Sequence, residues 1–184
     1  MNTVEPIRDT DIIANIKWDL KKKSLRNYGM FLLGINSALR ISDILKLKVE
    51  DLRKEDLYIR MTKTGQEITL PIADWLRREL SPLLDGRADH EYVFASRQSK
   101  KQGGRKSIDR SQAYRILRQA AKKYGLRRIG THTLRKTFAY HYYRSTNNIA
   151  MLMDLLGHSD ESFTLRYIGI TQDNINKAMK GFRL

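Results

Sequence analysis

Residues 131–139 contain a pair of side chains suited to binding an anion. His132 and Arg135 are three residues apart, so a helix would place both on one face, while Leu134 and Phe138 would point elsewhere, into a core. The pair lies at the start of the expected helix, where backbone N–H groups and the helix dipole already favour negative charge. For this pair taken alone, a surface helix with an arginine and a histidine near its cap is the commoner interpretation.

A second candidate lies in residues 38–47, where Arg40 stands among apolar residues at the mouth of an expected helix. Asp43 is placed to hold its guanidinium group. An arginine in such a setting is either half of a structural ion pair or a fork prearranged to bind phosphate. The residues around Arg40 leave both interpretations open.

Three further residues have ordinary explanations when each is taken singly. Lys63 directly precedes an expected hairpin turn, where an exposed lysine is common. His158 follows a glycine that closes a helix, and a histidine there is usually a plain C-cap side chain. Tyr167 lies nine residues after His158 and would more often be a core or interface aromatic than a nucleophile.

The elements that must position these residues are mainly helical. Thr10, Ser42 and Ser159 are suited to cap helices that follow them. Apolar residues recur at helical spacing in residues 10–23, 28–35, 42–47, 72–80, 109–125, 131–143, 148–156, 159–167 and 171–182.

The hydrophobic period changes to two in residues 57–61 and 67–70, on either side of a turn at Thr64 and Gly65. This alternation predicts an antiparallel hairpin that ends at Pro71, with a third strand near residues 49–52. The predicted fold class is therefore mostly α with a small antiparallel β-sheet (α+β), without an evident domain boundary.

Charge gives the first indication of a partner. The chain has 35 Lys and Arg against 20 Asp and Glu, a net charge of +15 and a pI near 10.1. Such an excess attracts a phosphate backbone, although ribosomal proteins and proteins of anionic membranes share it. Residues 96–109 form a basic loop that is either simply solvated or follows a phosphate backbone; its candidate DNA contacts are Lys100, Lys101, Arg105 and Lys106.

Composition excludes several classes of protein. Cysteine is absent, which excludes a disulfide scaffold, a thiol nucleophile and a thiolate metal site. The four histidines lack metal-ligand spacing and no nucleotide-binding glycine pattern occurs, so neither a metal nor a cofactor is expected. The apolar runs are too short to span a bilayer, and nothing at the N-terminus resembles a signal peptide. We therefore expect a soluble, cytoplasmic protein with no membrane partner.

Considered together, six residues resemble the tyrosine recombinase (phage integrase) family in order, spacing and local context: Arg40, Lys63, His132, Arg135, His158 and Tyr167. Residues 38–47, 132–139 and 155–167 carry the resemblance, and the strand-turn lysine lies between the first two blocks, as in the family. From Arg40 to Tyr167 the six residues bracket 128 positions, so the resemblance covers nearly the whole chain.

The resemblance implies site-specific cleavage and rejoining of DNA strands through a covalent 3′-phosphotyrosine, without metal or external energy. Tyr167 would be the nucleophile. Arg40 and Arg135 would hold the non-bridging phosphate oxygens, on which negative charge develops during the attack.

The remaining roles also follow from the resemblance. His132 and His158 would donate hydrogen bonds to the phosphate, and His132 would accept the tyrosine proton during cleavage. Lys63 would protonate the departing 5′ oxygen, and Asp43 would support the cationic cluster from behind.

Family members usually carry an N-terminal core-binding domain that closes around DNA. Only 39 residues precede Arg40, enough for two helices, so we expect a single catalytic domain over residues 1–184 with no core-binding domain. Lys136 stands where a second histidine is common in the family, and we expect it to lie outside the immediate surroundings of the reaction.

A tail helix is expected at about residues 171–184. In the family such a helix often packs on a neighbouring protomer, which implies a homo-oligomer, a tetramer, on double-stranded DNA; packing on its own domain is the alternative. The residues that would make this contact share helical spacing: Ile175, Ala178, Met179 and Phe182.

Three other functions compete with a recombinase. A type IB topoisomerase shares the chemistry, but the compact blocks and the short tail after Tyr167 favour a recombinase. A non-catalytic DNA-binding module would not need all six positions occupied. A basic helical RNA-binding protein would leave Arg40, Arg135 and Tyr167 without a common task.

Overall fold

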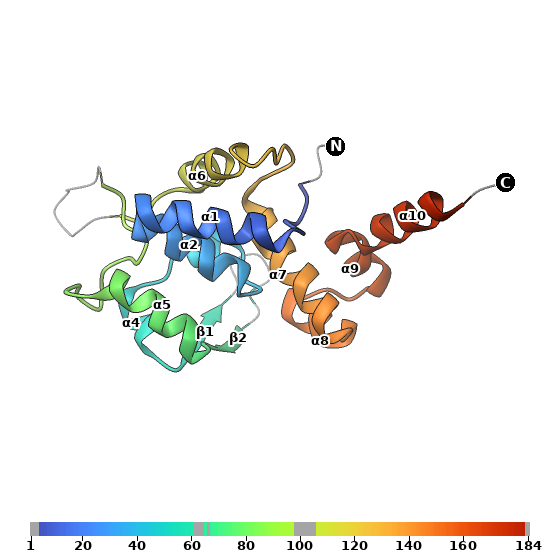
Figure 1. The fold of residues 1–184 in the computed structure, drawn as a ribbon. Helices are drawn as coiled ribbons and strands as arrows, with labels where there is room; N and C mark the ends of the chain where they lie inside the picture. The colour runs from blue at the N-terminus through green and yellow to red at the C-terminus, as the bar shows by residue number, and fades with distance from the viewer. Residues whose placement is uncertain (1–3, 61–64, 66, 98–105, 183–184) are drawn as a thin grey trace.

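The computed structural model of the chain describes residues 4–60, 65, 67–97 and 106–182. Within these ranges the fold is mostly helical with one small antiparallel sheet, which confirms the predicted fold class (Figure 1). The helices of this part of the chain include none that is long and apolar enough to cross a membrane. The elements follow one another in this order: α1 (Thr10–Lys23), α2 (Leu25–Ile35), α3 (Ile41–Ile44), α4 (Val49–Arg53), β1 (Asp56–Arg60), β2 (Glu67–Pro71), α5 (Asp74–Leu84), α6 (Arg110–Lys122), α7 (Thr131–Thr146), α8 (Ile149–Leu156), α9 (Glu161–Ile168) and α10 (Ile170–Gly181).

Helix α2 forms the centre of the larger core. All its residues from Tyr28 to Gly34 are buried, which is the pattern of a helix covered on every side. It contacts α1, α5 and α7, and α1 in turn contacts α6. In Figure 1, α1 and α2 cross the middle of this body, with α6 on one side of them and α5 on the other.

The predicted antiparallel strand pair is confirmed, while Thr64 of the predicted turn lies outside the described residues. Strands β1 and β2 pair antiparallel, with Leu57 opposite Leu70 and Ile59 opposite Ile68. Leu57 and Ile59 are buried while Tyr58 between them is exposed, so the alternation in the sequence marks the face that packs on the core.

A close contact between α2 and α7 determines how closely α7 packs against the larger core. A Cβ atom at Gly34 would stand only 2.4 Å from Cδ1 of Leu134. The glycine therefore lets the two helices approach where any side chain would hold them apart. Because Arg135 directly follows Leu134, this contact also fixes the depth at which α7 carries Arg135.

Helices α8, α9 and α10 form a smaller unit that follows α7 and extends to one side of the larger body (Figure 1). Gly157 ends α8 and Gly169 ends α9, both in the left-handed conformation that glycine adopts without strain. A second, smaller core joins this unit to the larger body; it comprises Leu152, Leu156, Ile168 and Ile170 from the unit with Ala38 and Ala139 from the larger body.

The third strand predicted near residues 49–52 is wrong, since this segment is helix α4. Val49 and Leu52 are both buried, and their separation of three residues fits one face of a helix. An alternating strand would have placed the two side chains on opposite faces, so the spacing of these two apolar residues favours the helix that is observed.

Three predicted helix caps are displaced. The N-caps of α1, α3 and α9 are Asp9, Arg40 and Asp160, rather than Thr10, Ser42 and Ser159. In α1 and α9 the carboxylates of Asp9 and Asp160 accept hydrogen bonds from backbone N–H groups of the first turn, so an aspartate takes the capping role from the neighbouring hydroxyl residue.

Candidate active site

A cavity of about 530 Å³ brings together five of the six predicted catalytic residues. Its walls come from the starts of α3, α6 and α7 and from α9 with the turn before it. Among the described residues that line it, none is Asp or Glu, so the site is cationic and suited to an anion. The lining residues are Arg40, Ile41, Ser42, Arg110, Thr131, His132, Arg135, His158, Phe163 and Tyr167.

Arg135 lies in the floor of this cavity and is 2% exposed, so the interpretation as a surface-helix arginine is wrong. Its Nη2 donates a hydrogen bond to the carbonyl oxygen of Leu156 at 2.7 Å. Its Nη1 is buried and has no hydrogen-bond partner among the residues that the structure describes. Burial lowers the pKa of Arg135 to about 10, which still leaves the guanidinium protonated at neutral pH.

Arg40 and Asp43 belong to α3 and its cap. Arg40 is the N-cap residue of α3, half-buried at the cavity wall. Asp43 is buried, and its negative charge opposes the effect of burial on the pKa of Arg135. Asp43 therefore lies close enough to Arg135 for its charge to act on the guanidinium, while its supporting role in the reaction stays a prediction.

His132 stands in the first turn of α7, at the mouth of the cavity. The residue as a whole is exposed, yet partial burial of its ring and the charges of Arg110, Arg135 and Arg40 lower its pKa below the ordinary value of 6.5. At neutral pH its imidazole is therefore uncharged, the form that can accept a proton.

His158 is not a plain C-cap side chain, because it lines the cavity and is held by a specific hydrogen bond. Its Nδ1 lies 3.1 Å from Oγ1 of Thr164, whose hydroxyl donates to the carbonyl oxygen of Asp160 at 2.9 Å. Since a hydroxyl has one proton, Nδ1 must be the donor, and Nε2 carries no proton in the neutral ring. Burial, with Arg135 and Arg40, lowers the pKa of His158 to about 4.

Tyr167 is held on three sides by other rings and a cation. The ring of His158 meets it edge-on at 5.1 Å between centroids, and the ring of Phe163 stacks at 6.3 Å. Lys136 places its Nζ 4.8 Å from the Tyr167 ring centroid. Burial raises the pKa of the phenol, while Arg135 and Arg40 oppose that rise.

The contact of Lys136 with Tyr167 corrects the expectation that this lysine lies away from the reaction. Lys136 is buried on α7, and its ammonium group faces the aromatic ring that would carry the nucleophile. A desolvated ammonium over a tyrosine ring gains up to about 2 kcal/mol. Lys136 therefore contributes to the orientation of the ring.

Sequence reasoning missed Arg110 and Phe163 as lining residues of the site. Arg110 begins α6 directly after the N-cap Asp109, and its charge is the first among those that lower the pKa of His132. The sequence contains one indication that Arg110 belongs to a cationic region, because no Asp or Glu occurs from Arg110 to Met153. For Phe163 the sequence indicates only an ordinary helix residue, and the position of α9 in the fold is what brings it into the cavity wall.

Four predicted residues lie outside the described part of the chain: Lys63, Lys100, Lys101 and Arg105. Lys106 is described and exposed, and it does not line the catalytic cavity. Over the described ranges, no group of three or more His, Cys, Asp or Glu could hold a metal ion.

Comparison with known proteins gives the class and the family. The fold is similar to a crystal structure of XerA recombinase, with a TM-score of 0.73 and 21% identity over 99% of this chain and 68% of that one. It is also similar to a lambda integrase dimer bound to a COC′ core site, with a TM-score of 0.69 and 20% identity over 89% of this chain and 47% of that one.

Two curated relatives are similar in sequence. One is the "Probable integrase/recombinase YoeC" of Bacillus subtilis, 46% identical over 183 residues, which are 99% of this chain and 98% of the relative. The other is the tyrosine recombinase XerA of Pyrococcus furiosus, 29% identical over 164 residues, which are 88% of this chain but only 56% of the relative.

The fold and these relatives define a site-specific recombinase of the tyrosine type. The sequence model of the Phage integrase family matches residues 9–173, and the chain belongs to this family.

Proposed function

We propose that residues 1–184 act as one catalytic domain that cleaves and rejoins DNA strands at specific sites through a covalent 3′-phosphotyrosine on Tyr167, without a metal ion. The observation that carries this proposal is Nη1 of Arg135, a buried donor without a partner in the described chain. A buried unsatisfied donor costs about 1–3 kcal/mol. A non-bridging oxygen of a phosphodiester bound in the cavity would remove that cost.

In the proposed step, the phenol oxygen of Tyr167 attacks the phosphorus, and the bond from phosphorus to the 5′ oxygen breaks. Arg40 and Arg135 hold the non-bridging oxygens on which negative charge builds. The phenol proton passes to His132, and Lys63 gives a proton to the departing 5′ oxygen. The reverse sequence, with a 5′ hydroxyl as the attacking group, rejoins the strand.

The pKa values of the site support this division of roles. Burial raises the pKa of the Tyr167 phenol, so its proton must be removed by a base rather than lost to water. The lowered pKa of His132 keeps the imidazole free to accept that proton. Bound phosphate would add a negative charge beside both the Tyr167 phenol and the His132 imidazole.

His158 requires a proton before it can donate to phosphate. Its Nδ1 proton is already engaged by Thr164, and its pKa of about 4 leaves Nε2 unprotonated at neutral pH. A bound phosphodiester would raise that pKa, because a nearby negative charge favours imidazolium. His158 would therefore take up a proton as DNA binds.

The exposed face of α6 supports duplex DNA as the partner. Arg110 lines both the catalytic cavity and a smaller cavity beside it, and Arg115 continues from there into a third cavity of about 680 Å³. This third cavity also holds Arg118, Lys122 and Arg127. The three cavities form a cationic track along which a sugar-phosphate backbone would lie. Further contacts to the DNA backbone would come from Lys100, Lys101, Arg105 and Lys106.

We further propose that the chain works as a homotetramer on double-stranded DNA, in the nucleoid. Ile175, Met179 and Phe182 of the tail are 49%, 65% and 65% exposed, and Ala178 is exposed as well, so their packing on their own domain is not observed. A similar fold occurs in a lambda integrase tetramer bound to a Holliday junction. Changing Ile175, Met179 and Phe182 to serine should impair pairing of two DNA sites more than binding of one site.

The test of the proposed function uses nicked duplexes that tile the DNA flanking the gene. Incubation with the wild-type chain in excess EDTA should give an adduct that survives SDS, and Tyr167→Phe should bind DNA but give no adduct. Binding without any adduct from the wild type would instead indicate a non-catalytic DNA-binding module. Adducts of equal yield on every sequence, with relaxation of any supercoiled plasmid, would indicate a topoisomerase.

A further inference from the structure

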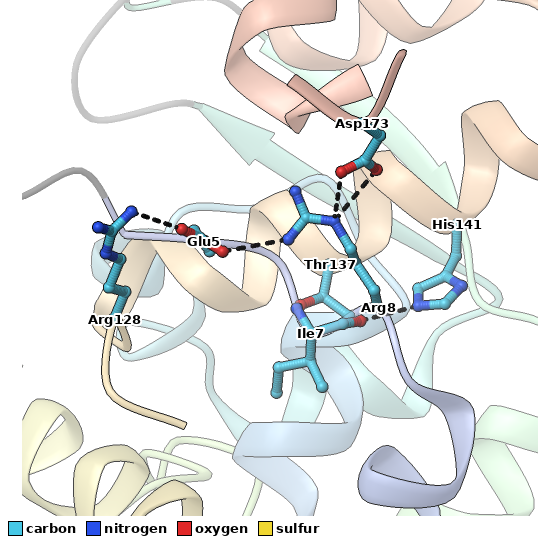
Figure 2. A network of polar contacts seen from close by, with 7 residues as sticks. All are labelled: Glu5, Ile7, Arg8, Arg128, Thr137, His141 and Asp173. Carbon is cyan, nitrogen blue, oxygen red and sulfur yellow. Dashed lines mark hydrogen bonds and ion pairs between the residues drawn. The ribbon is translucent and has the colours of Figure 1, made fainter. Parts of the chain in front are cut away.

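A network of polar contacts joins the segment before α1 to both parts of the molecule (Figure 2). The segment, residues 4–9, crosses α7 on its way to the first helix. The network contains seven residues: Glu5, Ile7, Arg8, Arg128, Thr137, His141 and Asp173.

The backbone of this segment is fixed on α7. The Ile7 N–H donates to Oγ1 of Thr137 at 2.9 Å, and Nε2 of His141 donates to the Ile7 carbonyl oxygen at 2.9 Å. The Ile7 side chain is buried in the larger core. On the other side of Ile7, the Glu5 N–H donates to the carbonyl oxygen of Arg128 at 2.9 Å. Hydrogen bonds therefore attach the segment to α7 through both backbone polar groups of Ile7.

Arg8 extends from this fixed segment to the unit that carries Tyr167. Its Nε lies 3.1 Å from each carboxylate oxygen of Asp173 in α10 (Figure 2). Its guanidinium also lies 5.5 Å from the centroid of the Tyr140 ring on α7. A Cβ at Gly169 would stand 2.6 Å from Nη2 of Arg8, so the guanidinium lies directly against the turn that ends α9.

The contact of Arg8 with the α9–α10 turn bears on the nucleophile because that turn lies next to Tyr167. Gly169 ends the helix in which Tyr167 lies, two residues earlier. The core that joins α8–α10 to α7 is small, with six buried residues among those described, so a polar tie from the segment on α7 adds to the contacts that hold α9 in place. A displacement of a reacting group by about 1 Å can cost 10²-fold in rate.

We propose that Arg8 is a positioning residue for Tyr167: it ties the α9–α10 turn to the segment on α7 and thereby holds the nucleophile in its own chain's cavity. This proposal rests on the proposed function. Arg8 lies just before residues 9–173, which the family model matches.

The test compares three variants that remove one charge each from the network. Arg8→Met and Asp173→Asn remove the tie to the nucleophile unit. Arg128→Met is the matched control, because Arg128 pairs with Glu5 at 2.8 Å on the same segment but does not touch α9 or α10. Single-turnover adduct formation on the nicked duplex is measured beside the dissociation constant for the same DNA.

We expect Arg8→Met and Asp173→Asn each to slow adduct formation roughly five-fold, the effect of a partly exposed ion pair, with the dissociation constant unchanged. The double variant should be no slower than either single one, since both remove the same contact. Asp173→Glu should restore most of the rate, and Arg128→Met should cleave like the wild type. Wild-type rates for Arg8→Met and Asp173→Asn, or an equal loss for Arg128→Met, would overturn the proposal.

Hydrogen exchange supplies a readout that does not depend on activity. The α9 amides should exchange faster in Arg8→Met and Asp173→Asn than in the wild type and in Arg128→Met. If the wild type forms no adduct, the proposed function fails, and exchange alone still decides whether Arg8 holds α9. Unchanged exchange in α9 would overturn the positioning role.

Discussion

The residues that would bind phosphate and the residue that would attack it are held by different means. Arg135 lies on α7, whose Leu134 packs into the large core around α2. Tyr167 lies on α9, in a unit that is held by a far smaller core and depends on ring contacts, Lys136 and Arg8. Stability within a protein is unequal, and regions with few buried apolar contacts open most readily.

This difference suggests a division of labour between a fixed phosphate-binding site and a nucleophile that can be released. The arginines of the cavity belong to α3, α6 and α7 of the larger body, and the hydrogen bond from Arg135 to the Leu156 carbonyl reaches into the smaller unit. We expect the tyrosine side to open locally without unfolding the larger body.

The largest effect is expected from Lys63, the proposed proton donor. If Lys63 protonates the departing 5′ oxygen, Lys63→Ala should slow cleavage by about 10²–10⁴-fold, the usual loss for a positioned proton donor. A substrate with sulfur in place of the 5′ bridging oxygen should restore the rate, since a thiol with a pKa of about 8.5 leaves without protonation. Adduct formation on matched oxygen and sulfur substrates gives both rates.

Arg40→Ala and Arg135→Ala are the controls for this prediction. Both should remain slow on the sulfur substrate, because their defect lies in holding the non-bridging oxygens. Equal defects of Lys63→Ala on the two substrates would remove Lys63 from the mechanism.

The next prediction tests whether the two cores lose protection independently. Leu134→Ala and Leu156→Ala each delete a buried side chain, one in each core, and each should cost about 2–5 kcal/mol. Native-state hydrogen exchange should show loss of protection throughout the molecule for Leu134→Ala. For Leu156→Ala the loss should be confined to α8–α10. Equal losses everywhere in both variants would mean that the molecule unfolds as a single unit.

The pH dependence of stability tests the nucleophile unit. His158 has a pKa of about 4 in the folded chain against an ordinary value of 6.5, so the unfolded chain binds its proton first as pH falls. Stability should therefore decrease as pH falls from about 6.5 to about 4, and the decrease should be smaller in His158→Gln. Urea unfolding at a series of pH values measures this, and identical pH profiles would contradict the burial of a neutral His158.

The smallest effect is expected from Lys136. Lys136→Met keeps the length of the side chain but removes the cation over the Tyr167 ring, worth about 0.5–2 kcal/mol, so adduct formation should slow by roughly 2- to 30-fold. Lys136→Arg should retain most of the rate because Arg also binds ring faces. A wild-type rate for Lys136→Met would show that the other ring contacts suffice.

Much of this site could be predicted from the sequence because its residues stand at fixed places in regular elements. His132 and Arg135 share a helix face at a spacing of three, and Gly157, the glycine before His158, ends a helix as expected and does so in the left-handed conformation. The hairpin could be predicted because its alternation continues through both strands.

The remainder depends on contacts between distant segments, which periodicity does not encode. Arg110 enters the cavity only because α6 starts beside α7. Lys136 faces Tyr167 although 31 residues separate them in the sequence. The tie between Arg8 and Asp173 joins the two ends of the described chain, where neither residue alone indicates a partner.

The central claim is that Tyr167 is the residue that attaches to DNA. The most direct measurement is mass spectrometry of the proteolysed adduct formed on a nicked duplex, which identifies the peptide that carries the nucleotide. The account predicts a single modified peptide with the phosphodiester on Tyr167, joined through the 3′ phosphate. Attachment to another of the nine tyrosines, or to any serine or histidine, would contradict it.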